Sequence, residues 1–382
     1  MARLSSVPSG SPARVALAAV GDPRSPSTWS GVTAGIFHGL HELGVAALPL
    51  DLALPRGLEQ VLLAAAAAAT RNRYDAEGAA LTMRTRSLLA RRGLNGVHID
   101  GVIQIGTSFT LPPGIPFVTL EDMTLRQASG SHPVFSRMSP HGIARWEKRR
   151  VEIYARARMC AVASHWAGES LLSDYRLPRE RVAVVGFGAT HTATVPDRVW
   201  THPRFLFVGI DWERKGGPLV LSAFSRVRRV HPDAVLDIVG GHPSLRQPGV
   251  NTHGVLSRAR DRDREIILEL FARATCFVMP SLIEPFGIAY VEAASAGVPS
   301  IGSSVGGPRD VIGDDGGIVV EPDDEAGLVE AMLRLADPDT ARRMGRAARE
   351  RSGLYTWRKV AERLLRALGL QAPGGQTLAE FL

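Results

Sequence analysis

Short apolar runs alternate with stretches of helical periodicity along the whole chain. The apolar runs are typical of buried strands. They lie at residues 14–20, 45–50, 102–105, 117–120, 159–163 and 182–185, and again at 205–208, 235–239, 276–279, from 300 onward and 318–320. Strands and helices that alternate in this way predict parallel sheets with helices on both faces, and therefore an α/β fold.

The helical stretches carry apolar residues on one face, as Ile36, Leu40 and Leu43 illustrate. They lie at residues 32–43, 57–92 with a break near 72–75, 136–158, 167–175, 217–230, 261–273, 324–335 and 356–368. The polar stretch 190–203 is typical of a linker. Since 382 residues are natural for two domains, we predict one domain at 1–195 and a second at 196–355, followed by a final helix within 356–382.

The segment 280–299 carries the clearest chemical signal. It follows a buried strand, ends at a Gly-Val-Pro stop, and holds two carboxylates, Glu284 and Glu292. We expect Glu284 at the carboxyl end of the strand and Glu292 about two turns down the next helix, which places them about 12 Å apart. That length suits a sugar, a diphosphate and a ribose in a row. The helix amino end favours phosphate, and Gly287 permits close approach of the backbone.

This segment resembles the donor-binding signature of retaining glycosyltransferases of family four, the group 1 family, which have the GT-B fold. The resemblance implies two Rossmann-like, doubly wound domains that face each other across a cleft, with the acceptor on the first and a nucleotide-diphospho-sugar on the second. It assigns the sugar hydroxyls to Glu284 and the ribose hydroxyls to Glu292, within a donor stretch that includes Phe286, Gly287 and Ile288. It also implies that the final helix crosses back to the first domain.

Residues 205–217 form a strand, a loop and a helix start at the beginning of the second domain. Arg214 and Lys215 would lie at the carboxyl edge of a sheet, where α/β proteins bind ligands, and both side chains suit phosphate oxygens. The stretch from Gly209 to Lys215 resembles the diphosphate clamp of the family. It departs from that pattern at Ile210, where the family has an arginine.

The first domain offers weaker candidates. Gly31 precedes a predicted helix, at the place where the family has a glycine loop that closes over the donor. Glu121 and Asp122 end a strand at which many family members carry a histidine, and they are candidates for general bases, helix caps or solvated residues. His132 and His141 lie on the following loop and are candidates for the missing imidazole.

Two other patterns have simpler explanations. The Gly306-Gly307 pair with Asp310 looks like a family turn, although a plain turn explains it equally well. The pair Asp261 and Asp263 mimics a metal-binding D-x-D motif, but aspartates at a helix start are ordinary caps. No cysteine and histidine cluster has ligand spacing. We therefore expect no metal and no cofactor besides the nucleotide-sugar co-substrate.

Charge and composition limit the partners. Residues 1–195 contain 21 Arg and Lys against 14 Asp and Glu, so they carry the whole net charge of +7. This excess is densest at 145–150. It suits an anionic membrane surface or a lipid-phosphate acceptor, or it is a solvated helix face, whereas no motif supports binding of nucleic acid.

Cys160 and Cys276 stand in apolar runs, and residues 1–20 do not resemble a secretory leader. We expect a cytoplasmic location, with room for peripheral contact at the inner membrane face.

The sequence therefore predicts a retaining, metal-independent glycosyltransferase. The expected catalytic residues are Glu284, Arg214, Lys215, Asp122 and Glu121, and the expected donor-binding residues are Gly31, Gly209, Arg214, Lys215, Glu284, Phe286, Gly287, Ile288 and Glu292. A nucleotide-sugar epimerase of GT-B architecture, a sugar phosphorylase and a non-catalytic nucleotide-sugar-binding module remain as alternatives. The nucleobase, the sugar, the acceptor and the oligomeric state are left open.

Overall fold

The computed structural model describes residues 12–70, 72, 80–131, 135–190, 198–257 and 260–371. The chain divides into two compact units. The first comprises residues 1–163, 167–185 and 357–382, and the second comprises 164–166 and 186–356. The division falls after Val185, whereas the sequence analysis placed it after residue 195, within a predicted linker of which residues 191–197 lie outside the described residues. In the described part of the chain, no helix is both long enough and apolar enough to cross a bilayer.

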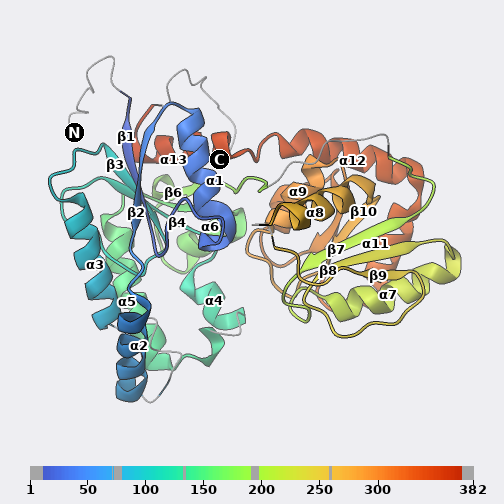
Figure 1. The fold of residues 1–382 in the computed structure, drawn as a ribbon, viewed down its shortest axis with the longest axis horizontal. Helices are drawn as coiled ribbons and strands as arrows, with labels where there is room; N and C mark the ends of the chain where they lie inside the picture. The colour runs from blue at the N-terminus through green and yellow to red at the C-terminus, as the bar shows by residue number, and fades with distance from the viewer. Residues whose placement is uncertain are drawn as a thin grey trace. The chain divides into compact units, whose positions relative to one another are not determined.

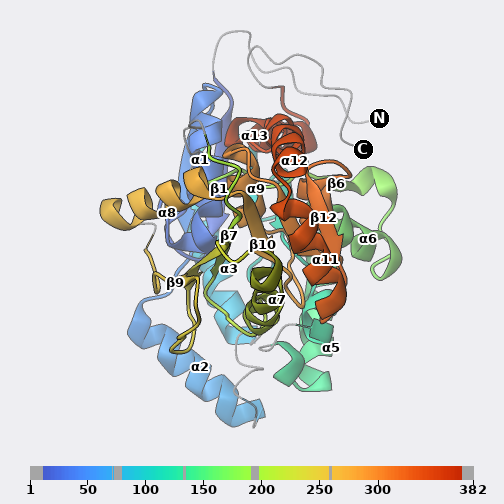
Figure 2. The same cartoon turned by 90° about the vertical axis from the view of Figure 1, so that its right-hand side faces the viewer.

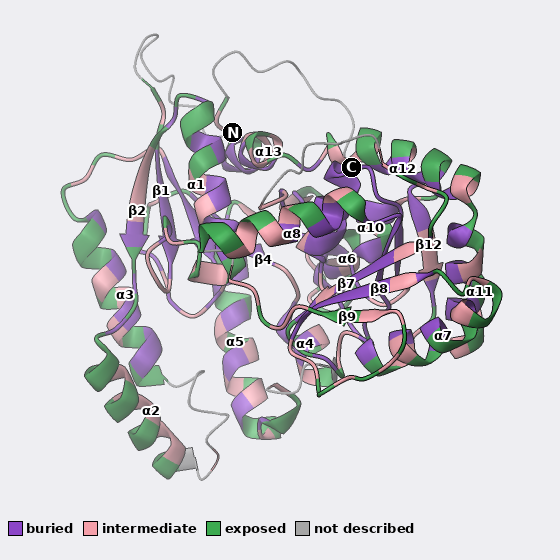
Figure 3. Cartoon of the chain, turned by 45° about the vertical axis from the view of Figure 1, so that its right-hand side comes forward, coloured by how far each residue is buried: buried purple, intermediate pink, exposed green. Residues whose placement is uncertain are grey.

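The first unit is built on a sheet of six parallel strands in the order β2-β1-β3-β4-β5-β6 (Figure 1). The strands are β1 (Arg14–Ala19), β2 (Ala46–Asp51), β3 (Gly101–Ile105), β4 (Phe117–Glu121), β5 (Met159–Val162) and β6 (Val182–Val184). The central strands β3 and β4 are buried along their whole length, which explains their continuous apolar runs (Figure 3).

The helices of this unit connect the strands. They are η1 (Thr28–Gly31), α1 (Val32–Glu42), α2 (Arg56–Thr70), α3 (Ala80–Leu94), α4 (Leu125–Ser131), η3 (Phe135–Arg137), α5 (Pro140–Arg156), α6 (His165–Ser173), η4 (Arg179–Arg181) and α13 (Trp357–Leu368). The chain runs from β1 outward to β2 and then returns past β1 to β3. Because parallel connections are right-handed, this reversal sends α1 and α3 to opposite faces of the sheet. The strand order therefore switches direction between β1 and β3.

The second unit repeats the plan with six parallel strands in the order β12-β11-β10-β7-β8-β9. They are β7 (Arg204–Gly209), β8 (Val235–Gly240), β9 (Val250–Thr252), β10 (Cys276–Met279), β11 (Ser300–Ser303) and β12 (Gly317–Val320). Here the chain runs from β7 outward through β8 to β9 and then returns to the other side of β7 as β10. The direction of the strand order therefore switches between β7 and β10.

Helices cover this second sheet as well. They are α7 (Gly217–Val230), α8 (Asp261–Arg273), α9 (Ile288–Ser295), α10 (Pro308–Ile312), α11 (Glu325–Ala336) and α12 (Pro338–Ser352). Helices α7 and α11 pack side by side (Figure 2). The predicted fold class, an α/β chain with two doubly wound parallel sheets, is confirmed.

The elements that the sequence analysis missed have weak apolar patterns. Helix α12 is rich in arginine and buries mainly small residues, Ala341, Gly345 and Ala348, together with Met344. The two faces of α12 differ clearly, but the helix is polar on average and holds few large apolar residues, so it forms no apolar stretch that stands out along the sequence. Strand β9 is short and mostly exposed, and the short helices α4 and α10 lie in stretches interpreted as loops.

The last helix, α13, packs against α1 within the first unit (Figure 2). Two glycines of α1 make this contact close. A methyl group at Gly35 would overlap the indole ring of Trp357, and one at Gly39 would overlap the Trp357 carbonyl. Helix α13 buries Val360, Leu364 and other apolar residues of one face. The close contact therefore depends on the absence of side chains at two positions of α1.

Gly39→Ala is expected to destabilise the protein by about 1–3 kcal/mol, because the added methyl group would overlap backbone that has little room to move. Gly57→Ala in α2 is the matched control, since a methyl group there meets no atom within 4 Å. That substitution is expected to be neutral or to stabilise by up to about 1 kcal/mol. Urea unfolding measures both effects, and equal free energies for the two variants would contradict the close packing of α13 on α1.

Candidate functional site

Two loops meet in the second unit where the strand order switches direction. One loop follows β7 and the other follows β10. The backbone N–H of Leu282 donates to the carbonyl of Arg214 over 2.8 Å, and the Arg214 guanidinium donates back to the carbonyl of Ile283 over 3.0 Å. Loops at the carboxyl ends of such strands are where α/β proteins bind ligands. The structure therefore brings together two segments that the sequence analysis selected separately.

Lys215 and Glu284 form an ion pair between these loops, through Lys215 Nζ and Glu284 Oε2. The two side chains are 15% and 8% exposed, so the pair is largely shielded from water. The hydroxyl of Ser281 lies 3.5 Å from the same carboxylate oxygen. Two residues that are 69 positions apart and were both predicted to contact the donor thus touch each other directly.

Glycines shape the loop that carries Lys215. A Cβ atom at Gly209 would lie 2.9 Å from Lys215 Cγ, so the absence of a side chain makes room for the lysine. Gly216 has a φ of +77°, and a Cβ there would overlap the carbonyl oxygen of Pro280. The left-handed conformation and the close approach both require glycine. Ile210, at the place where the family has an arginine, is 76% exposed.

Arg214 has partners within the protein. Its Nε lies 3.0 Å from Asp211 Oδ2, and its Nη1 donates to the Ile283 carbonyl. The guanidinium therefore helps to hold the two loops together. Arg214 thus joins the loops through Asp211 and Ile283, whereas Lys215 joins them through Glu284.

The backbone around Glu284 is held by the glycine turn at 306–307. Glu284 and Gly306 form an isolated parallel bridge, and the Gly307 N–H donates to the Glu284 carbonyl over 2.9 Å. Gly306 has a φ of +112°, and a Cβ there would overlap that same carbonyl group. Asp310, which follows the turn, accepts from the backbone N–H of His165 at 2.7 Å. The Gly-Gly turn therefore supports the position of Glu284.

Helix α9 begins at Ile288, after Gly287 in the left-handed region with a φ of +87°. Glu292 therefore lies about one turn into the helix, and the expected two turns are wrong because the preceding loop is not helical. Glu292 is 2% exposed. Phe286 is also 2% exposed and packs edge-on against Phe187 and Tyr355, so its ring is part of the core and does not face a ligand.

The first unit has a pocket of about 310 Å³ at its own switch point, between β1 and β3. Loops that follow β1, β3 and β4 line it together with α5. The lining residues are Ala19, Val20, Thr28, Trp29, Ile105, Gly106, Thr107, Ser108, Glu121, Asp122, Met123, Thr124, Leu125, Ala128, Phe135, Trp146 and Arg150. All of them belong to the first unit.

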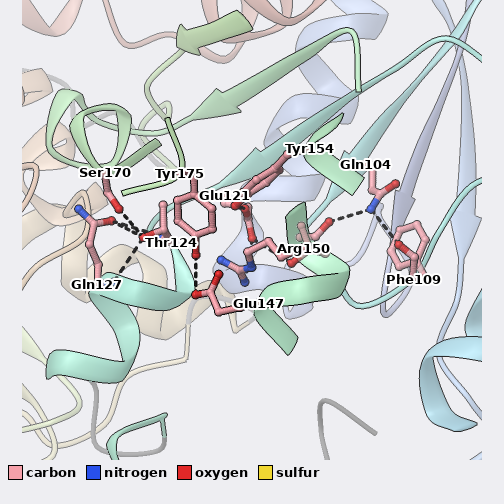
Figure 4. A network of polar contacts seen from close by, with 12 residues as sticks. Gln104, Phe109, Glu121, Thr124, Gln127, Glu147, Arg150, Tyr154, Ser170 and Tyr175 are labelled. Atoms are coloured by element: carbon pink, nitrogen blue, oxygen red, sulfur yellow. Dashed lines mark hydrogen bonds and ion pairs between the residues drawn. The ribbon is translucent and has the colours of Figure 1, made fainter. Parts of the chain in front are cut away.

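A buried network holds Glu121 at the edge of this pocket (Figure 4). Its Oε1 lies 3.1 Å from Arg150 Nη2 and accepts a 3.3 Å hydrogen bond from the Thr107 hydroxyl, and its Oε2 accepts from the Tyr154 hydroxyl. Burial, followed by the nearby Glu121 charge, raises the pKa of Tyr154 well above its ordinary value. Burial is the largest single influence and lowers the pKa of Arg150, but the nearby Glu121, together with Tyr154, Tyr175 and Glu147, outweighs it and raises that pKa. Glu121 is therefore a structural anchor, and a solvated Glu121 is ruled out.

The sequence analysis did not select Arg150 individually, and its interpretation of the 145–150 charges as a solvated face is wrong for this residue, which is 6% exposed. Trp146, Arg150 and Tyr154 are spaced by four residues along α5 and are all buried. This spacing places the arginine on the same helix face as two aromatic rings. That signal could have identified Arg150 as an inward-facing residue.

The structure describes three of the other candidate residues of the first domain, Gly31, Asp122 and His141. Gly31 precedes α1 with a φ of +86°, after Trp29 and Ser30, which also have positive φ values of 50° and 55°. Asp122 is half-buried at the pocket. His141 is exposed near the start of α5, and His132 lies outside the described residues.

The aspartates near the start of α8 act locally. Asp263 accepts from the Ser257 N–H at 2.7 Å, and Asp261 pairs with Arg264. Within the described ranges, no group of three or more histidine, cysteine, aspartate or glutamate residues is arranged to hold a metal ion.

Known proteins resemble this chain in sequence. The family model described as "Glycosyl transferases group 1" matches residues 202–337. The glycogen synthase of Mycobacterium tuberculosis is 37% identical over 166 residues, which cover 41% of this chain and 40% of that protein. The alpha-maltose-1-phosphate synthase of Mycolicibacterium smegmatis is 30% identical over 298 residues, which cover 69% of this chain and 72% of that protein.

A solved structure shows the same fold. The sucrose-phosphate synthase of Thermosynechococcus elongatus superposes with a TM-score of 0.66 over 92% of this chain and 96% of that chain, at 17% identity. Together with the two six-stranded parallel sheets, this likeness shows that the fold is GT-B.

Arg150→Met is expected to destabilise the first unit by about 3–5 kcal/mol, because it leaves the Glu121 carboxylate buried without its cation. Lys148→Met is the matched control on the same helix. Lys148 is exposed, so its replacement should change the free energy of unfolding by less than about 0.5 kcal/mol. The double variant Glu121→Leu with Arg150→Met should recover much of the loss, since both charges are removed. Chemical unfolding tests all three, and similar costs for the two single variants would contradict a buried pair.

Proposed function

The chain belongs to the group 1 glycosyltransferases, and we propose that it moves a sugar from a nucleotide-diphospho-sugar to an acceptor hydroxyl. Retention of the anomeric configuration is part of the proposal and rests on the likeness of residues 280–299 to the signature of family four. The observation that carries the proposal is the shielded Lys215–Glu284 pair at the switch point of the second sheet.

The diphosphate of the donor would bind at Lys215 and at the amino end of α9. A phosphate oxygen is a strong acceptor for an ammonium group, and the first N–H groups of a helix have no partner within the helix. The eight-residue helix α9 starts directly after the Glu284 loop, so its amino end lies close to the pair in the chain. In this proposal, the Lys215 ammonium group and the amino end of α9 would both attract the diphosphate.

Donor binding would exchange the partners of the Lys215–Glu284 pair. Lys215 would turn from the carboxylate to the diphosphate, and Glu284 would become free to accept from the sugar hydroxyls. Before the donor arrives, each charge stabilises the other in a shielded site, where an unpaired charge is costly. The ion pair would therefore hold Lys215 and Glu284 in place for the donor, and neither charge would be buried without a partner.

The same groups would stabilise the transition state. As the bond between the anomeric carbon and the diphosphate oxygen breaks, negative charge builds on that oxygen, and Lys215 with the α9 amides would neutralise it. The acceptor hydroxyl oxygen bonds to the anomeric carbon, and its proton passes to the departing diphosphate. Arg214 would act as a positioning residue, because it joins the two loops.

A nucleotide-sugar-binding module without catalysis is the second candidate. It is favoured by Ile210, which is 76% exposed at the position where the family clamp has an arginine. Such a module would bind donor but release no nucleoside diphosphate.

Two substitutions are expected to separate binding from turnover. A thermal-shift panel of UDP, GDP, ADP and dTDP first identifies the nucleotide, since the ligand that binds the folded state raises the midpoint. Lys215→Ala should then weaken binding of that nucleoside diphosphate by about tenfold or more in calorimetry, because a charge-assisted hydrogen bond is lost. Glu284→Gln should keep this affinity and lower turnover about 100-fold or more.

Glu213→Gln is the matched control for Glu284→Gln. Glu213 lies in the loop of Lys215 but is exposed, so its replacement should change neither quantity. Unchanged affinity of Lys215→Ala for the nucleoside diphosphate would contradict the proposal that Lys215 binds the diphosphate. Donor binding without release of diphosphate, across a broad set of acceptors, would favour the non-catalytic module.

Transfer is expected to proceed at an unchanged rate in excess EDTA, because Lys215 and the α9 amides supply the positive charge at the leaving group. Diphosphate release measured with and without chelator checks this expectation. A rate that falls in EDTA and returns with added magnesium would overturn metal independence.

A further inference from the structure

The pocket of the first unit has an apolar aromatic wall. Phe135 and Trp146 pack at 5.6 Å between ring centroids, and Trp29, Met123 and Leu125 line the same space. The volume of about 310 Å³ lies at the lower end of the range that ligand pockets occupy. Aromatic and aliphatic side chains that line a pocket of this size favour a compact ligand with an apolar face.

Polar groups at the same pocket lack partners. In the part of the chain that the structure describes, Nε and Nη1 of Arg150 and Nε1 of Trp146 are buried and make no hydrogen bond. Arg150 is 6% exposed and Trp146 is 7% exposed, and both line the pocket. Buried N–H groups without partners cost free energy, which an oxygen atom of a ligand would offset. The pocket therefore favours a ligand that carries a hydrogen-bond acceptor.

The charge of the lining argues against an anionic ligand. The lining residues that the structure describes include two carboxyl groups, Glu121 and Asp122, against one guanidinium, Arg150, so their formal charge is −1. Moreover, Arg150 is already paired with Glu121. Among the described lining residues, a phosphate group would therefore meet two carboxylates and a guanidinium that is already engaged by one of them. A hydroxyl group suits the site better, because its oxygen accepts from the unpartnered N–H groups and its proton is donated to a carboxylate.

The loop at 29–31 supports a binding role for Trp29. Trp29 and Ser30 both adopt left-handed conformations, with φ values of 50° and 55°, although neither is a glycine. Such strain is rare and gathers at functional sites, where the surrounding structure maintains it. Here it accompanies a tryptophan that lines the pocket.

We propose that this pocket takes the acceptor of the transfer, and that the acceptor is an uncharged hydroxyl compound with an apolar, planar body, with Trp29 as a specificity-determining residue. This inference rests on the proposed glycosyltransferase function. It excludes phosphate-bearing acceptors from the pocket, although the unit as a whole carries the positive excess of the chain. In the transfer, the acceptor oxygen bonds to the anomeric carbon, the bond from that carbon to the diphosphate breaks, and the hydroxyl proton leaves with the diphosphate.

Two matched probes test the charge and the body of the acceptor. Calorimetry without donor compares 2-naphthol, which is uncharged, with 2-naphthyl phosphate, which has the same rings and an anionic group. The expected result is binding of 2-naphthol at least about tenfold tighter than binding of the phosphate. Equal or tighter binding of 2-naphthyl phosphate, or no binding of 2-naphthol, would overturn the proposal.

Three variants test whether 2-naphthol binds in this pocket. Trp29→Ala is expected to weaken 2-naphthol binding about tenfold, which corresponds to about 1.4 kcal/mol. Trp166→Ala is the control, because Trp166 is half-buried outside the pocket and its loss should leave this affinity unchanged. Trp146→Phe keeps an aromatic ring but removes the indole N–H, and it should weaken binding severalfold. An unchanged affinity in Trp29→Ala would show that the probe binds elsewhere and would overturn the assignment.

The outcome is separable from that of the proposed function. Nucleoside diphosphate binding to Trp29→Ala is measured in parallel and should match the parent protein, since Lys215 and Glu284 belong to the other unit. If nucleotide binding fails in the parent protein while 2-naphthol still binds as expected, the proposed function is wrong and the pocket assignment stands as a binding site. If nucleotide binding and diphosphate release are normal while 2-naphthol fails to bind, only the acceptor assignment is wrong.

Discussion

Right-handed connections between parallel strands are the constraint on which both candidate sites depend. Each connection between parallel strands crosses one face of the sheet. Where the strand order reverses, the two neighbouring strands are followed by connections on opposite faces. The loops after these strands therefore diverge and leave space for a ligand at the strand ends. This happens between β1 and β3 in the first unit and between β7 and β10 in the second. The pocket of the first unit and the Lys215–Glu284 pair of the second lie at these two places.

Each unit also keeps a shielded ion pair at its switch point, and the two pairs are built for different purposes. Arg150 and Glu121 are 7% and 6% exposed in their side chains, and Glu121 has further hydrogen bonds to Thr107 and Tyr154. Removal of either charge would leave the other buried and alone. Lys215 and Glu284 lie between loops that glycines bring close together, and each has a proposed ligand partner. The first pair therefore supports a pocket, and the second is ready to exchange partners.

The distribution of charge differs between the surface and the interior of the first unit. The positive excess of residues 1–195 suggests anionic partners when only residue counts are considered. Among the pocket residues that the structure describes, however, the single arginine is already paired and a second carboxylate is present. Because Coulomb interactions are strongest at short range and low dielectric, the lining governs what the pocket binds, and the surface excess acts only over longer distances.

The sequence by itself determined the fold class, most strand positions and the two segments that form the candidate site of the second unit. Buried parallel strands leave continuous apolar runs, and the glycines of the 209–217 and 280–299 segments mark places where other side chains or backbone approach closely. These are local properties, so they can be read along the chain. Helix α12 escaped prediction because it is rich in arginine and buries mainly small residues, so it contains no conspicuous apolar stretch.

Only the tertiary structure decided which of these residues meet. The pairing of Lys215 with Glu284 spans 69 positions, and that of Arg150 with Glu121 joins a helix to a strand. Neither pairing follows from local sequence, because a charged residue has the same local pattern whether it is solvated or paired. The start of α9 at Ile288 and the inward position of Phe286 likewise depend on packing around the 280–287 loop. The chain specified the chemical groups, and the reversal of strand order in each sheet placed them together.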